Sequence, residues 1–144
     1  ESYFKKYPGI KEYMDKTVKD CRSDGFVVTP FGRRIFIPFI NDKVFNRRNF
    51  AERSAINAPI QGGAADLIKL AMPKIFQFLI KENLKSKMLI QVHDELIFEV
   101  PENEIDIIKE NIPSIMTNSH KNFLDLKVPI KVDLGLGKNW DEAN

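Results

Sequence analysis

The sequence predicts a single α+β domain in which antiparallel hairpins pack on long helices. Apolar residues recur at three- and four-residue spacing in three long stretches, and pairs of β-rich runs flank turn residues. No repeat, low-complexity tract or linker divides the 144 residues. With 43% hydrophobic and 29% charged residues, a chain of this length is expected to build one buried core and to fold as a soluble protein.

The first helix is predicted over residues 3–22, where Tyr, Phe, Ile, Met and Val follow helical spacing. Pro8-Gly9 is expected to interrupt it, because proline lacks a backbone donor and glycine lowers helix stability. Ser23, Asp24 and Gly25 follow the last apolar residues and predict the end of the helix.

A first hairpin is predicted after this helix. Residues 26–29 and 34–37 are rich in Val, Ile and Phe, and a Pro-Phe-Gly turn sequence separates them. The two runs are therefore expected to pair as antiparallel strands. The polar residues 41–49 are expected to form a loop that leads away from the hairpin.

A longer helical pattern runs from about residue 48 to residue 80, with frequent Ala, Ile and Leu. Pro59 and the Gly62-Gly63 pair are expected to kink or break this helix, and Pro73 is expected to kink it again. Polar side chains along the pattern share one face only if the helix continues through Pro59.

A second hairpin is predicted in LIQVHDELIFEV, from the apolar runs 88–92 and 96–100. Residues 102–118 predict a helix with one stripe of isoleucines. In residues 128–134 apolar residues alternate with others, which predicts a half-buried strand before an irregular tail.

Charge is unevenly distributed along the chain, although the net charge is only +2. Residues 1–60 carry 12 Lys and Arg against 7 Asp and Glu, residues 61–144 carry 10 against 13, and all six arginines lie between Arg22 and Arg53. Because guanidinium groups bind phosphates bidentately, the first part favours a phosphate-bearing partner. Chance clustering on a solvated surface remains the alternative.

The lengths of the apolar stretches and the cysteine content indicate where in the cell the protein is expected. The apolar stretches are far shorter than a membrane span, so no membrane partner is expected. Cys21 is the only cysteine, which excludes an internal disulfide or a cysteine-based zinc cluster and favours a cytoplasmic location. The chain opens without Met inside a helical pattern, so a fragment or a processed product is expected.

His93, Asp94 and Glu95 separate the two apolar runs, so the second hairpin is expected to present them at a rigid turn. Aspartate supplies a hard oxygen ligand for Mg²⁺, which binds one or two carboxylates and keeps other positions for water and phosphate oxygens. Asp and Glu are also common turn residues. These three residues alone therefore leave a metal site and an ordinary turn both open.

Arg53, Asn57 and Gln61 recur at every fourth position of ERSAINAPIQGGAAD, among small or apolar neighbours, and we refer to them as the polar row. Asn and Gln offer donors and acceptors for base edges, and Arg offers charge for phosphate or sugar. A solvated helix face is the alternative. Arg33 and Arg34, which follow a glycine, are further candidates for contact with a backbone phosphate.

Together, ERSAINAPIQGGAAD and QVHDELIFEV resemble the C-terminal part of a family A DNA polymerase of the bacterial DNA polymerase I type. The likeness extends to YFKKYPGIKEYM at the start, TPFGRRIFIP between and GKNWDEA at the end, in family order. Several independent motifs thus agree over nearly the whole chain, which is far more specific than His-Asp-Glu alone. The resemblance implies a DNA-directed DNA polymerase that acts in replication and repair.

The resemblance also implies a role for each matching residue. Asp94 is expected to bind the catalytic Mg²⁺ ions, Glu95 to shape the surroundings of the metal, and His93 to lie near the primer 3′ end. The polar row is expected to contact primer–template DNA and the nascent base pair, largely from the minor groove. Residues 1–25 are expected to be the end of the fingers, and residues 26–144 a portion of the palm.

The implied mechanism is two-metal phosphoryl transfer. One ion helps to ionise the primer 3′-hydroxyl for attack on the α-phosphate of a deoxynucleoside triphosphate, and the other steadies the pyrophosphate. The family's second catalytic Asp and its triphosphate-gripping fingers helix belong to upstream motifs that do not occur in this sequence. The isolated chain is therefore expected to be inactive, and the missing N-terminal part of the polymerase is an expected partner.

The sequence leaves two alternatives open. A non-catalytic DNA-binding fragment would bind primer–template weakly and with strong salt dependence. A complementing subunit from a split gene would instead recover synthesis when a second chain supplied the upstream motifs.

Overall fold

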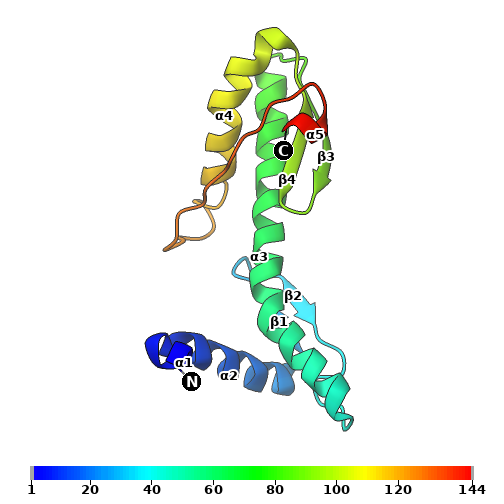
Figure 1. Cartoon of the computed structure of the whole chain (residues 1–144), viewed down its shortest axis with the longest axis vertical. Coiled ribbons are helices and arrows are strands. Elements are labelled where there is room, and N and C mark those ends of the chain that lie inside the picture. Colours follow the sequence, from blue (N-terminus) through cyan, green and yellow to red (C-terminus); the bar gives the residue numbers. More distant parts are fainter. Residues whose placement is uncertain (1, 144) are drawn as a thin grey trace. The chain divides into compact units, whose positions relative to one another are not determined.

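The computed structural model describes residues 2–143, and the chain divides into two compact units between Gly63 and Ala64 (Figure 1). The terminal residues of the predicted domain, Glu1 and Asn144, lie outside the described range. Helices accompany two antiparallel hairpins, as the predicted α+β class requires. Within residues 2–143 no helix combines the length and apolar composition needed to cross a membrane.

The first unit contains two short strands, two N-terminal helices and the first part of a long helix (Figure 1). Their bounds are α1 (Ser2–Lys6), α2 (Pro8–Asp24), β1 (Phe26–Val28), β2 (Arg34–Phe36) and α3 (Phe45–Lys81). The second unit holds the rest of α3 and the elements that follow it, which are β3 (Lys87–Val92), β4 (Glu95–Glu99), the 3₁₀ turn η1 (Glu102–Glu104), α4 (Ile105–Asn118) and α5 (Trp140–Ala143).

The break and the end of the first helical pattern lie where the sequence predicts them. Tyr7 leaves the helical conformation with φ −129° and ψ 68°, and Pro8 opens α2, where its missing N–H costs nothing. Gly25 ends α2 in the left-handed conformation with φ 77°, and its N–H donates to the Cys21 carbonyl at 2.8 Å.

The first hairpin is confirmed, and it packs on the core of its unit. Phe26 lies opposite Phe36 in the antiparallel register of β1 and β2. The core gathers one residue from α2, three from the hairpin region and two small residues from α3, which are Cys21, Val27, Ile37, Ile40, Ala51 and Ala55. The alanines let the α3 backbone approach the hairpin closely.

The expected loop over residues 41–49 is wrong in its second half, because α3 already begins at Phe45. The Asp42 carboxylate accepts a hydrogen bond from the Val44 N–H at 2.7 Å, which turns the chain into the helix. The first helical turn is polar and basic, so it carries no apolar periodicity by which the sequence could reveal it.

Pro59 and Gly62-Gly63 were expected to kink or break α3, and the break is wrong, since the helix runs without interruption through 37 residues. A kink at these positions or at Pro73 stays a prediction. Pro59 removes the donor for the Ala55 carbonyl, and Ala55 is fully buried in the core, so packing holds the helix there. The Tyr13 hydroxyl of α2 donates to the next carbonyl, that of Ile56, at 3.0 Å. Tertiary contacts thus override the local cost of proline.

The Gly62-Gly63 pair serves close packing and does not end the helix. A Cβ on Gly62 would lie 2.7 Å from Thr29 Cγ2 and 2.8 Å from Ile35 Cδ1, and a Cβ on Gly63 would lie 3.1 Å from Pro30 Cδ. Both glycines are buried under the first hairpin. They are required because only a residue without a side chain lets the hairpin lie directly on the helix.

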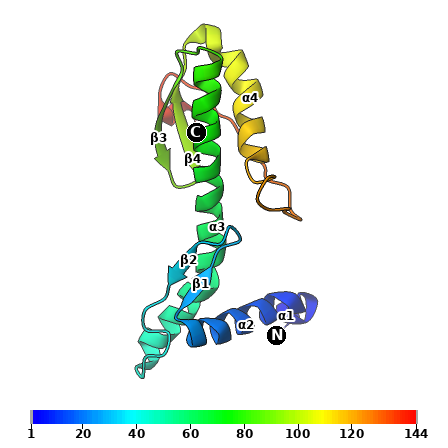
Figure 2. The same ribbon diagram turned by 180° about the vertical axis from the view of Figure 1, so that it is seen from behind.

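The second hairpin is confirmed, with a bulge at Leu89 between the paired residues Met88 and Ile90. In the second unit, α4 lies along one side of α3 and the hairpin along another, which both views show (Figures 1 and 2). The shared core joins α3 and α4 through Ala71, Ile75, Leu79, Ile108 and Ile112, and β4 residues pack against it. The predicted isoleucine stripe of α4 therefore faces the core.

The predicted strand over residues 128–134 is wrong, because the structure places no strand there. Val128 remains 71% exposed, and Leu134 is also exposed. A strand is stable only when a neighbouring edge satisfies its backbone groups, and within residues 2–143 no strand pairs with this segment. The alternating pattern is therefore present without the pairing that would give it a structure.

Candidate functional site

The polar row lies on one face of α3, as the sequence predicts for an uninterrupted helix. The side chains of Arg53, Asn57 and Gln61 are all exposed. Ala51 and Ala55, on the opposite face, are buried in the core of the first unit. The row therefore projects from a helix that is fixed along its other side, which restricts where the three side chains can reach.

The polar row forms one wall of an open hollow of about 560 Å³ within the first unit. Three exposed rings also line the hollow: Phe36 at the end of β2, Phe39 in the chain that follows, and Phe50 on α3 one turn before Arg53. We call these three rings the aromatic wall. A hollow of this size lies within the range of small-ligand pockets, about 300–1,000 Å³. It brings hydrogen-bonding groups and apolar rings to the same place.

Sequence analysis missed the aromatic wall. Phe36, Phe39 and Phe50 are 73%, 57% and 65% exposed. Phe39 has φ 66°, a left-handed conformation that a bulky residue seldom adopts. The available signal is the number of phenylalanines between residues 36 and 50, four within fifteen residues, but neither their exposure nor the backbone angle can be derived from it.

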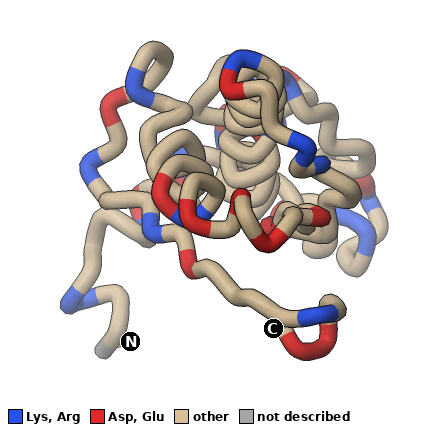
Figure 3. The backbone as a smooth tube through the Cα atoms, turned by 90° about the horizontal axis from the view of Figure 1, so that it is seen from above, with Lys and Arg blue, Asp and Glu red and all other residues tan. Residues whose placement is uncertain are grey.

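Arg53 carries the free positive charge of this site. Among the described residues it takes part in no ion pair or hydrogen bond. Its neighbour Glu52 is instead bound to Arg22 at 2.5 Å and lies 3.8 Å from Arg48. Basic and acidic positions are otherwise interspersed along the backbone (Figure 3). Arg53 is therefore available to a phosphate or a base edge at the rim of the hollow.

Arg33 and Arg34 make contacts inside the protein. Arg33 Nη2 donates to the Gly62 carbonyl at 3.0 Å, and its backbone N–H donates to Thr29 Oγ1 at 3.2 Å. The Arg34 guanidinium lies 4.9 Å from the centre of the Phe26 ring, within cation–π range. Arg33 thereby ties the hairpin turn to α3 one residue beyond Gln61, and contact of either arginine with phosphate stays a prediction.

The second hairpin presents its acidic residues at a tight turn. Val92 pairs with Glu95, so the turn itself consists of His93 and Asp94, and Glu95 opens β4. His93 has φ 52°, and its carbonyl accepts a hydrogen bond from Gln91 Nε2 at 3.3 Å. The side chains of His93, Asp94 and Glu95 are all exposed.

Asp94 presents a carboxylate, a group of the kind that binds divalent cations. Its carboxylate is exposed on a turn that two paired strands support, and Mg²⁺ binds proteins through one or two carboxylates while keeping water and phosphate oxygens. No group of three His, Cys, Asp or Glu side chains within residues 2–143 is placed to hold a metal. The described residues can therefore supply only part of the ligands of a metal site. A two-ion site needs further carboxylates from outside them.

The two candidate groups fall in different units. The polar row and the aromatic wall belong to the first unit, and the turn with Asp94 belongs to the second. Each group is held together by a single local structure. One face of α3 aligns the polar row, and the pairing of β3 with β4 forms the acidic turn. Two arrangements are thus available, one suited to a nucleic-acid base or backbone and one suited to a cation.

Comparison with known proteins gives a consistent result. The sequence profile of DNA polymerase family A matches residues 1–142. DNA polymerase I of Caldicellulosiruptor bescii is 50% identical over 141 residues, which is 98% of this chain and 16% of that protein. DNA polymerase I of Lactococcus lactis subsp. lactis is 50% identical over 143 residues, again 16% of its length. The chain thus spans about a sixth of the curated relatives that it matches.

A solved structure shares the fold. The POL domain of Pol1 from M. smegmatis, in complex with DNA primer-template and dNTP, superimposes with a TM-score of 0.89 and 40% sequence identity. The match covers 98% of this chain and 24% of that one. The helices and hairpins described above therefore correspond to a contiguous part of a larger domain.

Proposed function

Because the chain belongs to DNA polymerase family A, we propose that it contributes to template-directed DNA synthesis, the addition of deoxynucleotides to a primer 3′ end in replication and repair. The observation that carries this proposal is the exposed carboxylate of Asp94, held at a two-residue turn between paired strands. Since the chain spans 16% of its relatives' length, the activity would belong to a larger protein or assembly.

The residues of the first unit serve DNA binding in this proposal. Arg53, Asn57 and Gln61 contact primer–template DNA and the nascent base pair, where Asn and Gln can accept and donate at base edges. The free charge of Arg53 and the packed support of the row favour this role. Arg33 and Arg34 contribute to the same surface. Residues 1–25 then form the end of the fingers, and residues 26–144 a palm portion.

The residues of the second unit serve the metal. Asp94 would hold Mg²⁺, which supplies charge stabilisation for transfer of a nucleotidyl group when it is bound. The strand pairing around Asp94 keeps its carboxylate in place, so little reorganisation is needed on binding. Glu95, at the start of β4, adds negative charge beside it, and His93 lies next to it at the turn, on the side of the primer 3′ end.

The isolated chain is inactive in this proposal. One exposed carboxylate binds Mg²⁺ weakly, and within the described residues no third metal-binding group lies near it. The N-terminal part of the polymerase is therefore a required partner, together with primer–template DNA and deoxynucleoside triphosphates. The single buried cysteine suits a reducing cytoplasm, the setting in which DNA is copied.

A chimera tests the proposal directly. The matching segment of the Caldicellulosiruptor bescii polymerase is exchanged for this chain, and primer extension is measured with Mg²⁺. We expect extension that Asp94→Ala removes and that Glu110→Ala, at an exposed acidic position of α4, leaves unchanged. A folded chimera that is inactive, or one that keeps its activity after Asp94→Ala, would refute the proposal.

The isolated chain separates the remaining alternatives. On its own it should give no extension, and extension that depended on Asp94 would contradict the proposed inactivity. The chain is then mixed with the preceding part of the same relative as a separate polypeptide. Restored extension identifies a complementing subunit, whereas DNA binding without extension identifies a non-catalytic fragment, which the unpaired Arg53 also favours.

A further inference from the structure

We propose that the hollow lined by the aromatic wall and the polar row binds an unpaired nucleobase of single-stranded DNA. This inference deepens the proposed function and rests on it, since DNA is taken as the ligand. It adds single-stranded DNA as a ligand. The flat face of an unpaired base would stack on a phenylalanine ring, in addition to any contact that the polar row makes with duplex DNA.

The exposed rings are the first reason. Phe36, Phe39 and Phe50 line one hollow, yet each exposes more than half of its surface. Scattered exposed apolar residues need no explanation, but three exposed rings that line one hollow form an apolar lining large enough to cover a ligand. Such a surface is costly in water unless a ligand covers it.

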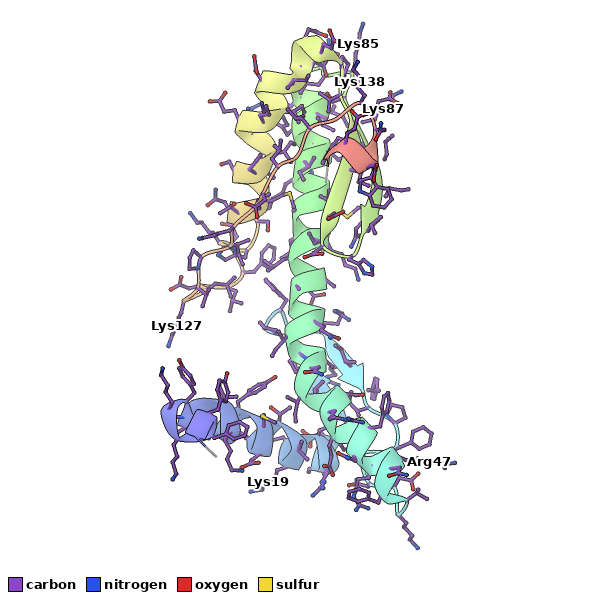
Figure 4. The ribbon with its side chains drawn as sticks, viewed as in Figure 1. Lys19, Arg47, Lys85, Lys87, Lys127 and Lys138 are labelled. Carbon is purple, nitrogen blue, oxygen red and sulfur yellow. The ribbon has the colours of Figure 1, made fainter. Side chains whose placement is uncertain are left out.

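The rings are also held in place, so little order has to be created on binding. Phe36 contacts Phe26 edge to face, with the ring centres 5.8 Å apart at 63°. The Arg47 guanidinium lies 5.7 Å from the centre of the Phe39 ring. Figure 4 labels Arg47 near the N-terminal end of α3. Arg47 also lies 3.7 Å from the Asp42 carboxylate, so its contact with the ring helps to hold Phe39 in place and adds little free charge.

Backbone strain at Phe39 is an independent indication. A φ of 66° costs free energy for a residue with a large side chain, and Asn or Gly would adopt it more easily. Strained positions of this kind cluster at ligand-binding sites. Here the strain places a ring at the hollow, while the Asp42 N–H donates to the Phe39 carbonyl at 3.0 Å and fixes the turn.

The side chains of the polar row offer groups that complement the edge of a base. Asn57 and Gln61 are exposed and offer both donors and acceptors for a base edge, and Arg53 offers an unpaired charge. Stacking faces combined with cationic groups are the usual means by which proteins bind single strands. A double helix hides its base faces inside the stack, so a base that stacks on these phenylalanine rings must have left it.

The test compares single-stranded and duplex DNA on the intact 144-residue chain. A fluorescein-labelled oligothymidylate and a blunt duplex are titrated separately at low salt, and binding is followed by anisotropy. The key variant is Phe39→Asn, because asparagine suits the left-handed backbone and removes the ring without threatening the fold. Base–aromatic stacking predicts that the affinity for the single strand falls about fivefold or more, while that for the duplex changes less than about twofold.

Matched variants make the result specific. Phe36→Leu should weaken single-strand binding in the same way, because leucine is apolar but offers no stacking face. Phe123→Leu, at a phenylalanine 63% exposed outside the hollow, should change neither affinity. Arg53→Gln should weaken both ligands and reduce the salt dependence by about one charge. A 2-aminopurine base in the single strand should be quenched on binding, and Phe39→Asn should reduce the quenching.

The outcomes separate the two proposals. If Phe39→Asn and Phe36→Leu leave single-strand binding unchanged while Arg53→Gln weakens duplex binding, the stacking inference is overturned and the proposed DNA contact stands. Equal losses on both ligands, or an equal loss in Phe123→Leu, also overturn it. If no DNA of either form binds at low salt, both this inference and the proposed DNA contact fail, and the aromatic wall is then better explained as a protein-docking surface.

Discussion

Glu104 shows how a single buried carboxylate organises the second unit. Its side chain accepts hydrogen bonds from the Lys85 and Ser86 backbone N–H groups, each at 2.8 Å, and from the Ser86 hydroxyl at 2.6 Å. It therefore joins the start of α4 to the segment that enters β3. The hydrogen bond from Ser86, followed by that from Lys85, lowers the pKa of Glu104 below its ordinary value of 4.5.

Glu104→Gln is predicted to destabilise the chain near neutral pH, because the amide accepts fewer of these hydrogen bonds and leaves donors unpaired. Since folding lowers the pKa, the stabilisation by Glu104 is fully present above about pH 4.5 and is lost as the pH falls through the lowered pKa. Urea unfolding midpoints should thus differ most at neutral pH and converge in acid. Glu102→Gln, at an exposed position of the same turn, is the control; a constant difference at all pH values would contradict the assignment.

Cys21 is predicted to be unreactive in the folded chain. Its thiol is fully buried, and burial, followed by the nearby Asp24, raises its pKa above the ordinary value of 9.0. Because the thiolate is the reacting species, a disulfide reagent such as DTNB should react slowly in buffer and rapidly in denaturant. Equal rates under both conditions would show that the core of the first unit opens readily.

At the scale of elements, α3 is where sequence and structure differ most. The first hairpin, the second hairpin and the ends of α2 follow from turn residues and β-rich runs, which act locally. The continuity of α3 does not, because it depends on contacts with residues distant in sequence, such as Tyr13 with Ile56 and Thr29 with Gly62. Pro and Gly signal a break only where nothing packs against them.

Alanine substitutions of two glycines, one in α2 and one in α3, are predicted to change stability in opposite directions. Gly62→Ala should lower the free energy of unfolding by up to roughly 2 kcal/mol, because overpacking of about 1–3 kcal/mol outweighs the gain of about 1 kcal/mol from helix propensity. Gly9→Ala in α2 should raise it by several tenths of a kcal/mol, since nothing lies within 4 Å of the added methyl group. Thermal or urea unfolding measures both. A stabilising Gly62→Ala would mean that the hairpin yields easily.

The candidate site likewise has a part that the sequence predicts and a part that it does not. The polar row and the acidic turn could be predicted, because each depends on one element: a helix period for Arg53, Asn57 and Gln61, and a strand pair for Asp94. The aromatic wall could not, since it joins residues on either side of a turn whose geometry depends on Phe39. The unpaired segment 128–134 was mispredicted because alternation shows a capacity for pairing but not the presence of a partner.

For the whole molecule, the exposed surface is large for the mass. The chain of 16.6 kDa exposes 10805 Å². One compact domain of this mass would expose about 7,600 Å², and two separate compact domains of half the mass about 9,100 Å² in total. Even without regard to how the two units are arranged, the two together must therefore bury less surface than two ordinary domains of half the mass. Exposed residues such as Val128 and Phe123 account for part of the excess.

This excess of exposed surface predicts that the free energy of unfolding depends less steeply on the urea concentration than in two ordinary domains of half the mass. The unfolded chain exposes about 24,000 Å², so unfolding exposes roughly one tenth less new surface than it would for two separate compact domains of half the mass. Because the urea m-value scales with that surface, it should be lower by about the same fraction. Circular dichroism in urea, compared with a two-domain globular protein of similar length, measures it. An m-value equal to that of the reference would show that the chain buries this surface in solution, through self-association or rearrangement.

The two cores are contiguous in sequence, one within residues 21–55 and the other within residues 71–112. During synthesis on the ribosome, every residue of the first core emerges before any residue of the second. The first hairpin and the start of α3 can therefore fold while the later half of the helix is still in the exit tunnel. For a helix shared by two units, the order of translation thus becomes an order of assembly, with the polar row in place before the turn that carries Asp94.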